Sequence, residues 1–242
     1  MRITKIMKRN RQANSFVIML DSRSRQTGTT IHNPTFNLTK PLSNVNTIRV
    51  KYVQFANTLF NIKDGQNVLG LVGLDQGIVP PAFYTPSELV TLINSFGIGI
   101  SLAYAQSSNS LIWDIGDGFL DVPNSSLRDT LGLQMGQTSY TGTFTTGLFL
   151  AAPMNVDFIS PQLQTSYYSY SGRERATNTQ PVITAPVLSG YGTMCVYQPS
   201  TLASLDTGGT QFAQLDFRVC DSLTGDEIPE IGHWSMQIEV FN

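Results

Sequence analysis

The chain has 242 residues, of which only 13% are charged, and its formal net charge at pH 7 is −2. Soluble domains usually contain about 25% charged residues, whereas this sequence is rich in Asn, Gln, Ser, Thr and Gly. The length predicts a substantial buried core, and the absence of a long apolar run excludes a transmembrane helix. Sparse charge is typical of proteins that pack against copies or partners, but many extracellular β proteins share it.

Positive charge is concentrated at the amino terminus. Residues 1–25 contain seven basic residues and one acidic residue, whereas the remainder contains eight basic and sixteen acidic residues. Basic arms contact nucleic acid, anionic lipid or an acidic neighbour, although termini are also often simply solvated. Both interpretations stay open for residues 1–14, whose candidate partner-binding residues are Arg2, Lys5, Lys8, Arg9 and Arg11.

The first residues do not have the pattern of a signal peptide. The basic start is followed neither by an apolar segment nor by a small-residue cleavage site. We therefore expect a protein made inside a cell, in which Cys195 and Cys220 remain reduced thiols.

Four segments alternate between apolar and polar residues, or are apolar throughout, and predict core strands. They are Ser15–Leu20, Asn46–Phe55, Leu215–Cys220 and Ser235–Phe241. A strand hairpin is also expected from residues 100–104 and 111–115. Many short strands separated by turns predict an all-β sandwich.

One helix is expected to begin at Thr85, where Thr85-Pro-Ser-Glu88 forms a capping box with proline at the first helical position. Apolar residues then recur with helical spacing up to Phe96, and Gly97 ends the segment. A second short helix is predicted at Ser126–Leu131. Residues 136–190 predict long loops with short strands. No shift in composition and no internal repeat marks a boundary, so residues 15–242 are expected to form a single domain.

Motifs for catalysis or cofactor binding are not found in the sequence. His32 and His233 are far apart in the chain, and no nucleotide-binding, nucleophile or zinc pattern is present. The best metal candidate, though a weak one, is a calcium site at Asp114, Asp117 and Asp121, for which a turn with solvated carboxylates is the simpler interpretation. We therefore expect no enzyme activity and no cofactor.

A loop at residues 165–175 has the composition of an interaction surface. Tyrosine provides contact area at small entropic cost, and arginine provides forked hydrogen-bond donors. A loop that lies over its own sheet is an equally good interpretation. The candidate partner-binding residues of this loop are Tyr167, Tyr168, Tyr170, Arg173 and Arg175.

Several segments together resemble single-jelly-roll capsid proteins of large icosahedral double-stranded DNA viruses and their virophages. LDSRSR at residues 20–25 matches their first strand end, although Ser24 stands where an acidic residue is common. Residues 136–190 match nothing in the pattern of that family. The other matching segments are residues 33–38, 42–50, 53–62, 83–94, 126–132, 215–221 and 234–241.

The resemblance implies a single eight-stranded antiparallel jelly-roll sandwich with one or two short helices in its connections. It further implies the penton, a homopentamer at the fivefold capsid vertices of the virion, or another minor capsid protein. The implied partners are the major capsid protein, minor capsid proteins, an internal membrane or viral DNA through the arm, and a vertex fibre or host receptor through outer loops. The chain length independently suits one sandwich, since two fused sandwiches need more chain.

A second class of function stays open beside the capsid interpretation. A carbohydrate-binding or receptor-binding β-sandwich, such as a fibre head, would present exposed aromatic residues, and the three tyrosines of the 165–175 loop are candidates for this role. A hydrolase on a β scaffold lacks a convincing acid and base pair in this sequence.

Overall fold

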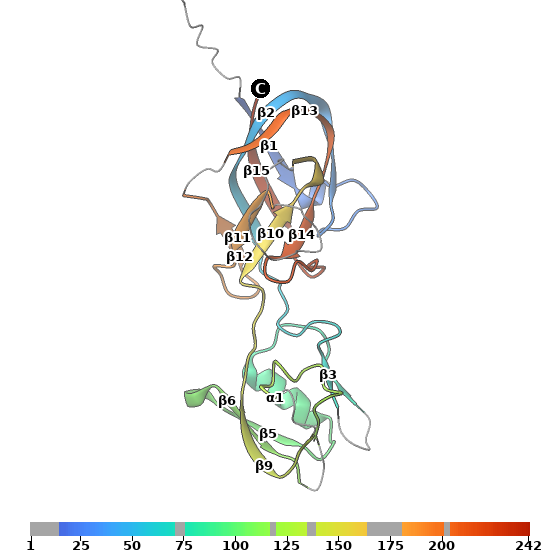
Figure 1. Ribbon diagram of the computed structural model, residues 1–242, viewed down its shortest axis with the longest axis vertical. Helices are drawn as coiled ribbons and strands as arrows, with labels where there is room; N and C mark the ends of the chain where they lie inside the picture. The colour runs from blue at the N-terminus through green and yellow to red at the C-terminus, as the bar shows by residue number, and fades with distance from the viewer. Residues whose placement is uncertain (1–14, 71–75, 117–119, 135–138, 164–180, 201–203) are drawn as a thin grey trace, which may run out of the picture. The chain divides into compact units, whose positions relative to one another are not determined.

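The computed structural model describes residues 15–70, 76–116, 120–134, 139–163, 181–200 and 204–242. These residues form two compact units (Figure 1). The jelly-roll unit comprises the described residues up to Asn57 together with Asn155–Asn242, and the inserted unit is Thr58–Met154. The structure thus differs from the single domain expected over residues 15–242. Both units consist of short strands and polar turns, so composition does not change at their boundaries.

The first sheet of the jelly-roll unit has the strand order β1-β15-β2-β12, and every pairing is antiparallel. In β1, Ser15 pairs with Phe241 and Asp21 pairs with Ser235. The second half of β2 lies between β15 and β12. These strands are β1 (Ser15–Asp21), β2 (Thr35–Ala56), β12 (Met194–Tyr197) and β15 (Trp234–Phe241).

The second sheet contains the first half of β2 and the remaining strands of this unit. Leu215 of β13 pairs with Phe36 of β2, β13 is followed directly by β14, and β14 pairs with β10, which in turn pairs with β11. These strands are β10 (Asn155–Ile159), β11 (Ile183–Pro186), β13 (Ser204–Asp216) and β14 (Arg218–Asp221), and the short 3-10 helices of the unit are η1 (Ser22–Ser24) and η3 (Pro161–Leu163).

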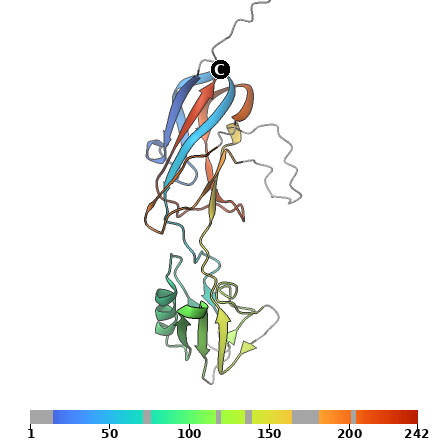
Figure 2. The ribbon, with the colours of Figure 1, turned by 90° about the vertical axis from the view of Figure 1, so that its left-hand side faces the viewer.

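The connectivity of these strands is that of a jelly roll. When the two halves of β2 count separately and β13 with β14 counts as one strand, each sheet has four strands. In chain order, strands one, eight, three and six form the first sheet, and strands two, seven, four and five form the second. Figure 2 shows the two sheets face to face. The predicted all-β fold is confirmed, and the four predicted core strands lie in it.

Aromatic side chains hold the two sheets together. Trp234 of β15 lies edge to face against Phe36, Phe158 and Phe217, with ring centroids 5.2 to 5.7 Å apart. Such pairs add stability beyond the area they bury. The indole N–H of Trp234 donates to the backbone oxygen of Ile31 at 2.9 Å, so no polar atom of this ring is left unpaired.

The inserted unit has a hydrophobic core of its own. Trp113 of β6 is fully buried and stacks on Phe144 of β9 at 5.5 Å, and its indole N–H donates to the Thr146 hydroxyl at 2.9 Å. The main sheet has the order β5-β6-β9. The strands are β3 (Val68–Leu69), β4 (Gly77–Ile78), β5 (Ser101–Ala105), β6 (Ser110–Asp114), β7 (Leu120–Asp121), β8 (Ser139–Tyr140) and β9 (Thr143–Gly147), and η2 (Gln106–Ser108) joins β5 to β6.

The helix predicted to begin at Thr85 is confirmed as α1 (Pro86–Ser95), with the complete capping box. The second predicted helix is wrong, because residues 126–131 form consecutive turns. This segment is too short to be stable as a helix without strong caps, and Gly132 ends it in a left-handed conformation with φ +66°. No helix in the described part of the chain is long and apolar enough to cross a membrane.

Candidate assembly surface

The partner-binding residues predicted from the sequence lie outside the described residues. They are Arg2, Lys5, Lys8, Arg9 and Arg11 of the arm, and Tyr167, Tyr168, Tyr170, Arg173 and Arg175 of the loop. The structure does describe where both segments join the jelly-roll unit. The arm joins at Ser15, and the loop lies between Leu163 and Pro181. Leu163 lines a small apolar cavity together with Ile18 of β1 and Val45 of β2.

The outer face of the first sheet exposes apolar side chains on both of its edge strands. Residues that pair across strands share a face, and Asp21, Ser235, Gln54 and Val196 pair in sequence across the sheet. The β1 strip, which we define as Val17 and Met19, is on this face because these residues lie four and two positions before Asp21, and every second residue of a strand shares a face. Each of the two residues is 53% exposed. The β12 strip, defined as Met194 and Val196, is 52% and 58% exposed.

Polar groups occupy the centre of this face, between the two strips. Lys51 of β2 forms an ion pair with Glu239 of β15 at 2.9 Å. Lys51 is an extra residue of a β-bulge, because Gln237 pairs with Tyr52 whereas the next residue, Ile238, pairs with Val50. The centre of the face is therefore charged, whereas its two edges are apolar.

Ser235 is a buried hydroxyl on the same face. Only 6% of the residue is exposed, and its Oγ has no hydrogen-bond partner among the described residues. Its neighbours across the strands are Asp21 and Gln54. Buried hydroxyl groups without a partner are uncommon in folded proteins.

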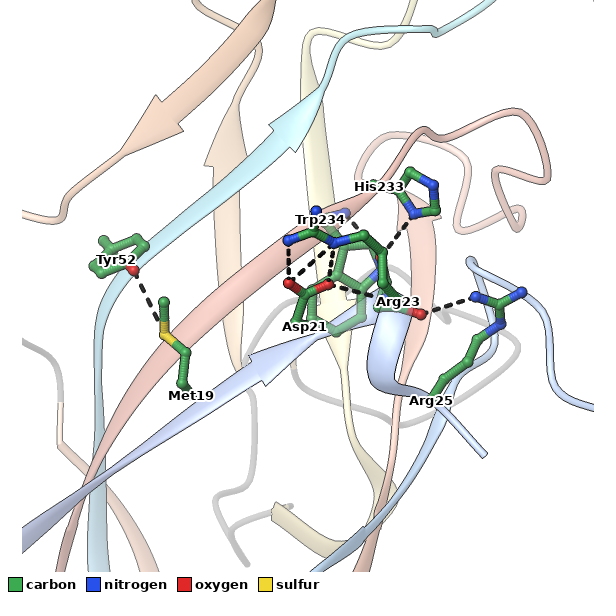
Figure 3. A network of polar contacts seen from close by, with 8 residues as sticks. Met19, Asp21, Arg23, Arg25, Tyr52, His233 and Trp234 are labelled. Carbon is green, nitrogen blue, oxygen red and sulfur yellow. Dashed lines mark hydrogen bonds and ion pairs between the residues drawn. The ribbon is translucent and has the colours of Figure 1, made fainter. Parts of the chain in front are cut away.

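The LDSRSR segment forms the corner between β1 and the loop that follows (Figure 3). The Arg23 side chain and its backbone N–H donate to the Asp21 carboxylate. The hydrogen bond from the Arg23 side chain is the largest cause of a lowered pKa at Asp21, and the same contact raises the pKa of Arg23. This pair holds the chain where it leaves β1.

Ser22, in the middle of this corner, is fully buried and connects it to β15. Its hydroxyl accepts the backbone N–H of Trp234 at 3.0 Å and lies 3.5 Å from Nδ1 of His233. The Arg25 side chain donates to the backbone oxygens of Ser22 and Thr29. Figure 3 labels Asp21, Arg23, Arg25, His233 and Trp234 of this corner and marks its polar contacts with dashed lines. The segment that carried the sequence resemblance therefore has a structural role, and His233 acts in it as a hydrogen-bond partner.

The two histidines lie at different places in the jelly-roll unit. Nε2 of His32 is 3.9 Å from the Glu227 carboxylate, whereas His233 contacts Ser22. Cys195 and Cys220 are buried free thiols. Burial raises the pKa of the Cys220 thiol, which disfavours its reactive thiolate form.

The described members of the weak calcium candidate hold turns. Asp114 accepts the backbone N–H of Gly116 at 3.3 Å, and Asp121 accepts the side-chain amide of Asn124 at 2.6 Å. Asp117 lies outside the described residues. Across the described parts of the chain, no group of three acidic, histidine or cysteine side chains is placed to hold a metal ion.

The two strips are not evident from the sequence as a pair, although the sequence of β1 contains a signal for one of them. Phe16-Val-Ile-Met-Leu20 is apolar at five consecutive positions, and strands of this kind are usually covered on both faces. Ile18 and Leu20 face the core, whereas Val17 and Met19 lie on the opposite face. The absence of polar residues at alternate positions of Phe16–Leu20 is therefore the signal that predicts an apolar outer face on β1.

Comparison with solved structures identifies a similar fold in a viral protein. The crystal structure of the mavirus penton protein matches with a TM-score of 0.51 and 11% sequence identity, over 95% of this chain and 99% of that chain. Because the match covers 95% of the chain, it includes most of the inserted unit as well as the jelly roll. No family model matches the sequence, and no curated protein sequence matches it. The likeness shows a penton-like jelly-roll fold.

Proposed function

We propose that this chain is a structural capsid protein of an icosahedral double-stranded DNA virus, and that it forms a homopentamer at the fivefold vertices of the virion. The observation that carries the proposal is the shared architecture. The described residues form one jelly roll with a unit inserted after its third strand, and the match to the mavirus penton protein covers 95% of the chain.

Two properties of the chain support a role in assembly rather than in catalysis. Only 13% of its residues are charged, and the first sheet exposes apolar side chains on both edge strands. Exposed apolar edges are normally avoided in monomers because they promote association. In a capsid, association of this kind is the function.

The partners that follow from this proposal are other copies of the chain and the neighbouring major and minor capsid proteins. The arm and the 165–175 loop both belong to the jelly-roll unit. The basic arm would meet a polyanion, either viral DNA or an internal anionic membrane. Loops that face outward would contact a vertex fibre or a host receptor.

The mass of the purified protein in solution tests the proposed pentamer. The chain has a mass of 26.6 kDa, so five copies give about 133 kDa (5 × 26.6). Native mass spectrometry is expected to show this species as the main assembly. A closed ring with a different number of copies would contradict the proposed place at a fivefold vertex.

The arm is tested by replacing its five basic residues, Arg2, Lys5, Lys8, Arg9 and Arg11, with glutamine. Retention on anionic vesicles or double-stranded DNA is expected to fall, with the largest difference at low salt, because exposed charges are screened within about 8 Å at physiological ionic strength. A control replaces Lys40 and Lys63 with glutamine instead, outside the arm. Equal retention of wild type and arm variant at low salt would show that the arm is only a solvated terminus.

The interpretation as a carbohydrate-binding or receptor-binding module stays a prediction. Its candidate residues Tyr167, Tyr168 and Tyr170 lie outside the described residues. A glycan array with the purified protein tests it, and a variant with all three tyrosines replaced by serine is the matched control.

A further inference from the structure

We propose that the β1 strip and the β12 strip are the two halves of one contact, in which the β1 edge of one copy packs against the β12 edge of the next. The inference assigns the surface through which copies of the chain contact one another. It rests on the proposed function in one respect, namely that the copies close into a ring. It follows from the exposure, charge and direction of the two edge strands.

The β1 strand has more apolar surface than its own chain covers. Phe16 to Leu20 are apolar on both faces, and in strands of that kind both faces are normally buried. The inward face packs on the sandwich core, where Leu20 is 3% exposed. Val17 and Met19 remain half exposed on the outward face. Met19 is fixed there, because its sulfur accepts a hydrogen bond from the Tyr52 hydroxyl at 3.5 Å (Figure 3).

The β12 strand lies in a stretch of sequence without charges. No Asp, Glu, Lys or Arg occurs from residue 176 to residue 205. The described part of this stretch exposes Leu188, Tyr191, Met194 and Val196. Charged residues are depleted, and Tyr and Met enriched, in the cores of protein–protein interfaces. The exposed residues of this stretch therefore have the composition of an interface core.

The position of the strips favours a side-by-side contact over a face-to-face contact. The Lys51–Glu239 ion pair occupies the centre of the face, and stacking two such faces would remove these charges from water at a cost that ion pairing does not always offset. A side-by-side contact keeps the pair hydrated. It also covers the outer edges of β1 and β12, which have no strand partner within the described residues.

The direction of the strands suits the same arrangement. Each neighbour in the order β1-β15-β2-β12 is antiparallel to the next, so β1 and β12 run in opposite directions. A rotation about an axis roughly along the strands preserves their directions. The β1 edge of one copy therefore meets the β12 edge of the next in antiparallel orientation, as hairpin neighbours do. Because the two strips differ, the contact is heterologous and generates a ring when it closes.

Sedimentation velocity and native mass spectrometry test the contact with Met19→Lys and Val196→Lys. Each variant places a charge in one strip and is expected to weaken association at least tenfold. The matched control is Leu223→Lys, which changes an 81% exposed leucine in the turn after β14 of the same unit. The control is expected to associate within twofold of wild type. Circular dichroism confirms that all three variants are folded.

A mixture of the two strip variants tests whether the contact is heterologous. The β12 strip of Met19→Lys chains is intact, and so is the β1 strip of Val196→Lys chains. An equimolar mixture is therefore expected to form one-to-one dimers that cannot grow into rings, at concentrations where either variant alone is mainly monomeric. A mixture that stays monomeric overturns the pairing of unlike strips.

The outcomes separate this inference from the proposed function. If the wild-type chain forms pentamers and both strip variants form them equally well, the assigned surface is wrong and the penton proposal still stands. A wild-type ring of another size that both variants disrupt supports the surface and contradicts the penton. A wild-type chain that remains monomeric at every concentration overturns both.

Discussion

Trp234 illustrates how a single side chain organises the jelly-roll unit. Its ring contacts aromatic side chains from three other segments of the chain, and its indole and backbone N–H groups donate to Ile31 and Ser22. The apolar alternation of the sequence placed Met236, Ile238 and Val240 in a strand. It could not show which distant segments Trp234 joins, because those contacts depend on sheet order rather than on local pattern.

Asp216, at the end of β13, is a carboxylate held by side-chain hydrogen bonds. It accepts from the side chains of Thr35, Gln214 and Gln162. Burial raises the pKa of Asp216, but these three hydrogen bonds together outweigh burial and leave the pKa below its usual value. A carboxyl pKa that is lower in the folded state stabilises the fold above the unfolded-state value of about 3.9. This stabilisation is lost as the pH falls through the folded-state pKa.

We therefore expect Asp216→Asn to lower the free energy of unfolding at pH 7 by about 1–2 kcal/mol, since hydrogen bonds to a charged acceptor are lost. The difference from wild type should shrink as the pH falls from about 5 towards 2, because the wild-type carboxyl is then protonated as well. Urea unfolding followed by tryptophan fluorescence measures both quantities. Asp129→Asn, at a carboxylate 78% exposed, serves as the control. A difference that is independent of pH would contradict the assigned role of the charge.

At the scale of elements, strands and helices with strong local signals were predictable and those without them were not. The capping box predicted the start of α1, and the alternation of apolar and polar residues predicted β15. The two-residue strands β3, β4, β7 and β8 are too short to carry a period. Residues 126–131 have helical spacing but form turns, because tertiary hydrogen bonds compete there: the Ser125 and Ser126 hydroxyls accept backbone N–H groups of Gly70 and Val68.

The capping box of α1 gives a prediction at this scale. Thr85 Oγ1 accepts the backbone N–H of Glu88 at 3.3 Å, and the Glu88 carboxylate accepts the backbone N–H of Thr85 at 2.8 Å. Thr85→Ala removes the cap, and we expect the inserted unit to lose about 1 kcal/mol of stability. Thermal unfolding measures the loss. Thr91→Ala within the same helix is the control and should be neutral or stabilising, since alanine has the higher helix propensity.

Only part of the candidate assembly surface could be predicted from the sequence. The continuous apolar run in β1 and the charge-free residues around β12 are visible in the printed sequence. Their arrangement as two opposite edges of one face is not, because more than 170 residues separate Met19 from Val196. Only the pairing of β15 between β1 and β2 brings the two strips onto the same face.

For the whole molecule, the main departure from expectation is the separate inserted unit. Its core residues all lie between Ile62 and Leu148, whereas the aromatic cluster around Trp234 belongs to the jelly-roll unit. A unit that buries its own apolar residues can fold and unfold cooperatively by itself. The chain contains only two tryptophans, and each unit holds one of them, Trp113 or Trp234.

This distribution allows the independence of the two units to be measured in the full chain. In a Trp113→Phe background, fluorescence reports only the jelly-roll unit; in a Trp234→Phe background, it reports only the inserted unit. Leu111→Ala removes a fully buried side chain from the inserted core and should cost about 2–5 kcal/mol. We expect it to lower the unfolding midpoint reported by Trp113 and to leave the midpoint reported by Trp234 unchanged. The reciprocal change, Val53→Ala in the jelly-roll core, should move only the Trp234 transition. If either substitution shifted both transitions equally, the two units would form one cooperative domain, and the single domain expected from the sequence would be the better description of how the chain folds.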